Sequence, residues 1–159
     1  MLLYQSASGD AADGTSVFTM NGGEMTCQSG AMFYCTNTKS VINLNGAGLN
    51  LSEEGELLIV SQGRWGKDGK NGGDCTLNAC HQTLEGEIAV DGLSKLALNL
   101  TDSEWTGSFS GKGLISVSLD ADSVWTLTDD CEIAAFSGDP NCVNLNGHTL
   151  YIDGAPIGA

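Results

Sequence analysis

Short sequence patterns recur along this chain at a nearly fixed spacing, and this recurrence restricts its fold more than any other feature. Three pairs of segments carry the pattern: 102–106 and 122–126, 43–46 and 144–147, and 96–100 and 115–119. The first pair reads Asp-Ser-Glu-Trp-Thr and Asp-Ser-Val-Trp-Thr, twenty residues apart. A fixed period of this kind is the signature of repeat proteins, whose units bury a core only when they stack on one another.

Between the repeated segments, apolar and polar residues alternate over short runs that end at Gly, Asn or Asp, which is typical of β-strands separated by turns. The echoes divide the chain into turns of three short strands. First strands are expected at 16–20, 41–45, 74–78, 95–100, 114–119 and 142–146. Second strands are expected at 24–27, 48–51, 82–85, 104–106, 123–127 and 148–152. Third strands are expected at 31–35, 56–60, 87–90, 108–110 and 131–136.

These three series advance by similar steps, so the sequence predicts an all-β parallel β-helix, a three-faced solenoid of about 5–6 turns. A single domain is expected over residues 1–159, with a loop insertion at 61–73 where the step is longest. The inward-facing residues should be Val41, Leu57, Ile59, Leu96, Leu98, Ile115 and Val117. A β-sandwich is the competing fold, but it would need hairpin turns and no fixed period.

The charge is strongly acidic, with 20 Asp and Glu against 6 Lys and Arg and a net charge of −14. A nucleic-acid binder needs a basic surface, so nucleic acid is excluded as a partner. Anionic membrane surfaces are excluded for the same reason, and no apolar run is long enough for membrane insertion. An acidic surface suits solubility outside cells, calcium binding, or contact with neutral sugars, and simple solubility remains an open alternative.

The chain has an even number of cysteines, at Cys27, Cys35, Cys75, Cys80, Cys131 and Cys142. The absence of a Cys-x-x-Cys pair and the presence of only two histidines argue against zinc. Sequential disulfides are the simplest prediction and would indicate an oxidising compartment: Cys27–Cys35, Cys75–Cys80 and Cys131–Cys142. Buried free thiols that act as small core residues are the alternative.

Several segments resemble stretches of large right-handed β-helix proteins of anaerobic and gut bacteria, which are adhesin-like or carbohydrate-binding-domain-like. These segments are 30–38 with 41–44, 64–66 followed by 71–73, 82–88, 122–127 and 147–151. The resemblance covers nearly the whole chain from about Thr15. It implies a pectate-lyase-like right-handed β-helix, secreted or on the cell surface of a bacterium, that forms the C-terminal turns of a longer surface protein. It does not imply a mechanism.

No set of catalytic residues stands out. Lyases of this fold commonly use calcium with an Arg or Lys base, and the only arginine, Arg64, lies in the inserted loop. That loop either contributes to a functional site or is a solvent-exposed loop without a function of its own. His81 adjoins Cys80, but neighbours in a strand point to opposite faces, so no Cys–His dyad is expected. We therefore expect no enzymatic activity and no resident cofactor, with a polysaccharide lyase or hydrolase as the alternative.

Calcium is the one metal that the sequence makes plausible, because carboxylates lie two or three residues apart in expected turns. The candidate ligands are Asp120, Asp122, Asp129 and Asp130, and a second acidic turn contains Asp10 and Asp13. No spacing matches an EF-hand. Exposed acidic residues in turns, with no metal, are the alternative.

The candidate carbohydrate-binding residues are Trp65, Trp105, Trp125 and Arg64. Trp105 and Trp125 lie one turn apart on the same face. If they point outward, they form an aromatic strip suited to a glycan; if they point inward, they form a ladder in the core. The alternation of neighbouring residues leaves both orientations open.

The sequence therefore predicts a non-catalytic extracellular module for adhesion, carbohydrate binding or structural assembly. Its partners would be glycans or another surface protein. A solenoid that ends on unpaired strands also offers a template for end-to-end self-association, so a filament subunit is a further alternative.

Overall fold

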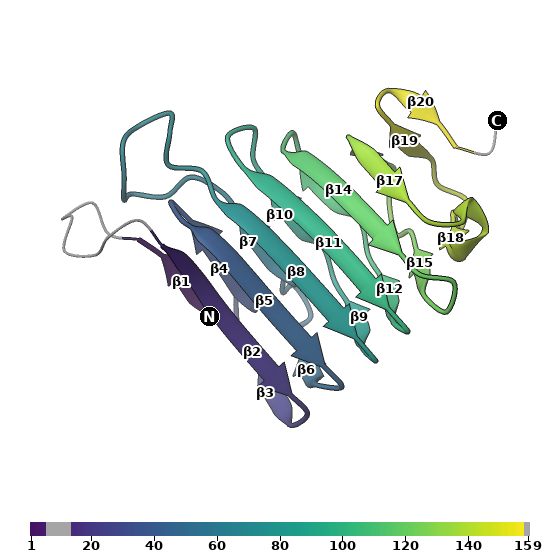
Figure 1. Ribbon diagram of the computed structural model, residues 1–159, viewed down its shortest axis with the longest axis horizontal. Helices are drawn as coiled ribbons and strands as arrows, with labels where there is room; N and C mark the ends of the chain where they lie inside the picture. Colours follow the sequence, from purple (N-terminus) through teal and green to yellow (C-terminus); the bar gives the residue numbers. More distant parts are fainter. Residues whose placement is uncertain (6–13, 158–159) are drawn as a thin grey trace.

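The protein is a parallel β-solenoid, as seen in a computed structural model that describes residues 1–5 and 14–157 (Figure 1). Strands stack from turn to turn across the molecule, and the described part contains almost no helix beyond a 3₁₀ turn at Pro140–Cys142. The predicted all-β solenoid is therefore confirmed. There are about seven turns, one or two more than expected.

Three series of strands form the walls of the solenoid. The broad sheet has six parallel strands: β2 (Thr15–Asn21), β5 (Lys39–Asn45), β8 (Asp74–Cys80), β11 (Lys95–Thr101), β14 (Leu114–Leu119) and β17 (Ala135–Ser137). The back sheet has five: β1 (Leu2–Tyr4), β4 (Phe33–Thr36), β7 (Leu58–Val60), β10 (Ile88–Val90) and β13 (Phe109–Gly111). The third wall contains β3 (Glu24–Thr26), β6 (Gly48–Asn50), β9 (Thr83–Glu85), β12 (Glu104–Thr106), β15 (Val124–Thr126) and β18 (Val143–Asn144).

The last turn departs from the predicted strands. The expected strand 131–136 bends at Ala134 and divides into β16 (Cys131–Ile133) and β17, and β17 joins the broad sheet. Segment 142–146, expected in the broad sheet, instead contributes β18 to the third wall. β19 (Leu150–Ile152) then pairs with β16 and with the antiparallel β20 (Ala155–Pro156). After Ala134, each predicted strand was therefore assigned to the wrong wall of the solenoid. The reason is that a corner of one residue carries no turn signal in the sequence.

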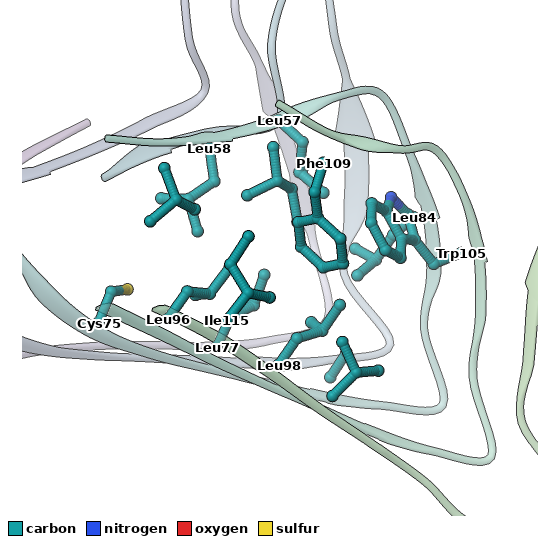
Figure 2. Close-up of a cluster of buried hydrophobic side chains, with 14 of the residues drawn as sticks. Leu57, Leu58, Cys75, Leu77, Leu84, Leu96, Leu98, Trp105, Phe109 and Ile115 are labelled. Atoms are coloured by element: carbon teal, nitrogen blue, oxygen red, sulfur yellow. The ribbon is translucent and has the colours of Figure 1, made fainter. Parts of the chain in front are cut away.

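The core forms because residues in register from successive turns stack inside the walls. Leu77 and Leu98 are in register on neighbouring strands of the broad sheet, and both are fully buried. Figure 2 shows them beneath the side chains of the back sheet and the third wall. Burial confirms five of the predicted inward residues: Leu57, Leu96, Leu98, Ile115 and Val117.

Two predicted inward residues face outward. In β5 the inner face belongs to Ser40, Ile42 and Leu44, so Val41 is half-exposed on the outer surface. In β7 the buried positions are Leu58 and Val60, and Ile59 lies outside. Both errors have the same cause: apolar residues occupy consecutive positions in these strands, so alternation alone does not fix which face is buried.

Residues 61–73 connect β7 to β8 as an irregular loop, as the repeat spacing predicted. The side chain of Asn71, which is buried, holds the loop closed. Its amide nitrogen donates to the carbonyl oxygens of Gly63 (2.6 Å) and Trp65 (3.0 Å). The loop is therefore a folded excursion beside the back sheet.

Candidate functional site

Trp105 and Trp125 point into the core, so the outward orientation that carbohydrate binding by these two candidates requires is wrong. They are 1% and 0% exposed, and their strands pair in a register that sets one directly over the other. Each indole nitrogen donates to a backbone carbonyl oxygen of the preceding turn: Trp105 to Gly86 (3.1 Å) and Trp125 to Gly107 (3.0 Å). They form a ladder in the core, which is the inward alternative that the sequence left open.

Trp65 is the tryptophan that remains at the surface. Its ring centroid lies 4.5 Å from that of Tyr4, with 30° between the planes. The guanidinium carbon of Arg64 lies 4.5 Å from the Trp65 ring centroid, within cation–π range. We call these three side chains the Trp65 cluster. The inserted loop provides two of them, and the exposed Tyr4 comes from the outer surface of β1. The sequence named Arg64 and Trp65 as candidates but not Tyr4, because a three-residue strand gives no periodic signal.

Polar contacts hold the loop that carries the Trp65 cluster against the back sheet. The Tyr34 hydroxyl donates to the carbonyl oxygen of Gln62 (3.2 Å) and accepts from Ser61 Oγ (3.2 Å). Across β4, the amide nitrogen of Asn37 donates to the carbonyl oxygen of Gln5 (2.8 Å), just after Tyr4. The positions of Trp65 and Tyr4 are therefore fixed by neighbouring strands of the same sheet.

The four candidate calcium ligands do not gather into one site. Among residues 1–5 and 14–157, no three His, Cys, Asp or Glu side chains are placed to share a metal ion. Asp120 accepts hydrogen bonds from Ser123 Oγ (2.6 Å) and from the Asp102 backbone nitrogen (3.1 and 3.2 Å). The Ser123 hydroxyl is the main reason that the pKa of Asp120 lies below its usual value.

The other acidic candidates also lie in turns. The carboxylate of Asp129 accepts from the backbone nitrogen of Asp130, and that of Asp130 from the backbone nitrogen of Thr149, both at 2.7 Å. Asp122 is exposed on the turn before β15. Asp10 and Asp13 lie outside the described residues. Asp120, Asp129 and Asp130 thus serve as hydrogen-bond acceptors in turns.

All six cysteines are free thiols, and none of the predicted sequential disulfides forms. Cys75 and Cys80 lie five positions apart on one extended strand, about 16 Å, so they cannot be bridged. The sulfur near Cys35 is that of Cys75, 3.5 Å away in the core. That contact, together with burial, raises the pKa of Cys75. Burial also raises the pKa of Cys131, whose sulfur accepts from the backbone nitrogen of Phe109 at 3.3 Å.

Cys80 and His81 do come together, contrary to the sequence expectation. The Cys80 sulfur lies 3.0 Å from Nδ1 of His81, and Nε2 of His81 lies 3.4 Å from a carboxylate oxygen of Asp102. The alternation rule fails here because His81 is not part of β8: its φ of +50° begins the corner after the strand. Asp102 occupies the same corner one turn later and was not a candidate in the sequence.

The outer surface of the broad sheet carries a ladder of amide side chains. The amide nitrogen of Asn99 donates to Oδ1 of Asn78, and that of Asn78 to Oδ1 of Asn43, both at 2.8 Å. The amide nitrogen of Asn43 then donates to the Thr19 hydroxyl at 3.1 Å. One polar chain therefore crosses four turns of the solenoid.

Comparison with known proteins returned no match to a protein-family model, to a curated protein, or to a solved structure. Of the features that the resemblance implied, the structure shows the parallel β-solenoid. No helix in the described part is long and apolar enough to cross a membrane.

Proposed function

We propose that this protein is a non-catalytic binding module of a secreted or cell-surface bacterial protein, and that the Trp65 cluster contacts carbohydrate. The observation that carries the proposal is the pairing of two partly exposed aromatic rings beside the one arginine of the chain. Aromatic rings pack against the apolar faces of sugars, while a guanidinium donates hydrogen bonds to their oxygens.

The surroundings of the cluster favour a neutral polar ligand. The chain has a net charge of −14, which disfavours acidic polysaccharides and leaves neutral sugars as the better class. The rings are held by a sheet and by a tied loop, so little conformational entropy is lost on binding.

A glycan array tests this function. The wild-type protein is compared with Trp65→Ala and Tyr4→Ala, and with Tyr151→Ala as a matched control, since Tyr151 is an exposed aromatic residue in β19. Binding that is lost in the first two variants and kept in the control supports the proposal. Repeating the array with calcium and with a chelator shows whether binding needs that ion. Wild-type protein that binds no neutral glycan overturns the proposal.

Self-association through the N-terminal end is a second candidate function. β2 is the edge strand of the broad sheet, has seven residues, and carries no charge. Phe18 and Met20 on β2 and Met25 on β3 pack against the core but stay partly exposed, because no described turn covers them. A long uncharged edge with an apolar inner face is a template for strand pairing.

The occupant we propose for this end is the same end of a second copy. The opposite edge of the broad sheet, β17, has only three residues, and the last strand of the neighbouring sheet, β20, contains Pro156. Two β2 strands related by a two-fold axis would pair antiparallel without bringing charges together. Light scattering should then give a dimer that Val17→Lys disrupts and that Val124→Lys, an exposed valine on β15, leaves intact. A monomer at all concentrations excludes this role.

A further inference from the structure

Three side chains form a connected chain of atoms at one corner of the solenoid: Cys80, His81 and Asp102. The imidazole lies between the thiol (3.0 Å from Nδ1) and the carboxylate (3.4 Å from Nε2). The order of groups is that of a nucleophile, a base and a residue that orients the base. The His81 and Asp102 side chains are 64% and 59% exposed and Cys80 is half-buried, so small molecules can reach the site.

The corner itself does not require these side chains. Strand register aligns Asn21, Asn45, Cys80 and Thr101, so the residues that follow them occupy one position in four successive turns. Those residues are Gly22, Gly46, His81 and Asp102, with φ of +70°, +59°, +50° and +45°. Glycine adopts positive φ most readily. Two turns use glycine, and the next two place an imidazole and a carboxylate side by side in adjacent turns.

We propose that Cys80 is a nucleophilic thiol that exchanges with small cationic disulfides, with His81 as its base and Asp102 as the positioning residue. The Cys80 sulfur attacks one sulfur of the disulfide, the S–S bond of that molecule breaks, and its other half leaves as a thiolate. The Cys80 proton passes to His81 and then to the leaving thiolate. The products are a mixed disulfide on Cys80 and one free thiol, so the disulfide itself is the oxidant.

The charge around the site selects the class of disulfide. Asp102 lies against the imidazole, and the carboxylate of Asp120 accepts from the Asp102 backbone nitrogen. Together with the net charge of −14, these carboxylates attract a cation and repel an anion. The positions in register on the preceding turn, Asn45 and Gly46, add no charge. A disulfide with amino groups, such as cystamine, is therefore the expected reactant.

The chain contains its own reference thiols. Cys27 and Cys142 are half-buried like Cys80, but the hydrogen bonds of their sulfurs within the described part go to backbone carbonyl oxygens, such as those of Ser29 (3.2 Å) and Asp120 (3.8 Å). All three can be followed in one sample of reduced, folded protein. A difference in reaction rate between Cys80 and the other two cysteines reports the effect of the His81 imidazole, because all three are half-buried and share one solution.

The test is the rate of mixed-disulfide formation at each cysteine with cystamine at neutral pH, measured by peptide mass spectrometry. We expect Cys80 to react about 10- to 100-fold faster than Cys27 and Cys142. His81→Gly should bring Cys80 down to their rate while their own rates stay constant, because glycine already occupies this corner at Gly46. An unchanged Cys80 rate in His81→Gly, or equal rates at the three wild-type cysteines, overturns the proposal.

Asp102 is tested separately because it acts through His81. Asp102→Gly should slow Cys80, and Asp102→Asn should restore part of the rate, since asparagine tolerates positive φ and its amide oxygen still accepts from the imidazole. A purely structural role would leave no difference between the two variants. Dithiodiglycolate, which carries two negative charges, should react more slowly than cystamine at Cys80. Equal rates for the two disulfides would overturn the assignment to cationic reactants.

Discussion

Trp105 and Trp125 stack on one another in the core, with ring centroids 5.1 Å apart and planes inclined by 16°. Parallel register produces this relationship, because Trp105 on β12 pairs with Trp125 on β15. Leu84 on β9 continues the column on one side and Val143 on β18 on the other. The repeated tryptophan in the sequence is therefore a consequence of stacking, and the column ties four turns of the third wall together.

Trp125→Ala should lower the free energy of unfolding by about 3–5 kcal/mol, because it removes a fully buried ring and leaves a cavity beside Trp105 and Phe109. Urea unfolding followed by circular dichroism measures the change. Trp65→Ala is the control and should cost about 1 kcal/mol or less, since Trp65 is partly exposed. Equal losses in the two variants would contradict the inward orientation of Trp125.

Gly107→Ala should destabilise the protein by about 1–3 kcal/mol through overpacking. A β-carbon at Gly107 would collide with the backbone carbonyl oxygen of Gly86 and with the indole of Trp105, and a backbone atom has little freedom to move away. Gly92→Ala is the matched control, because the nearest atom to its β-carbon would be 3.9 Å away. Chemical denaturation of both variants checks the difference, and a neutral Gly107→Ala would show that the corner can open.

The sequence predicts the architecture well wherever a repeated segment occurs in two turns. The period, the third wall at Trp105 and Trp125, and the inserted loop all follow from repetition. It fails at Val41 and Ile59, where apolar neighbours occupy both faces of a strand. Near the C-terminus it fails at Ala134, where a corner of one residue separates two strands.

The candidate sites were harder to predict because they depend on which residues meet across turns. Trp105 and Trp125 occupy equivalent positions of the repeat. Whether they point inward depends on the space that Gly107 leaves for an indole, and the sequence pattern does not show that space. Tyr4 meets Trp65 across residues far apart in the chain. The contact of Cys80 with His81 needed the positive φ at residue 81, and an alignment of His81 with Gly22 and Gly46 is the one sequence signal that could have indicated it.

Asn78→Ala should cost about 1–2 kcal/mol, because Asn78 donates to one neighbour of the amide ladder and accepts from the other. Its neighbours are partly exposed, so water compensates for some of the loss. Thr76→Ala is the control, since Thr76 is partly exposed on the same outer face of β8. The free energy of unfolding measures both changes. Equal, small losses would mean that the ladder contributes nothing beyond what water supplies.

Asp120 should make stability depend on acidic pH. The Ser123 hydroxyl, and then backbone nitrogens including that of Asp102, favour the charged carboxylate and lower its pKa in the folded state. A lowered folded pKa stabilises the protein above the unfolded value of about 3.9, and this contribution is lost as the pH falls through the folded pKa. The melting temperature should therefore differ between wild type and Asp120→Asn by a constant amount above about pH 5, and the gap should close on further acidification.

Ser123→Ala distinguishes the contribution of Asp120 to the pH dependence of stability from the contributions of the other nineteen acidic residues. It removes the hydroxyl that donates to Asp120 Oδ1. In the Ser123→Ala background, Asp120→Asn should therefore change the melting temperature in a way that depends less on acidic pH. The four proteins form a double-mutant cycle whose coupling is measured at neutral and at acidic pH. A coupling that is the same at both pH values would show that Asp120 stabilises its turn without regard to its charge.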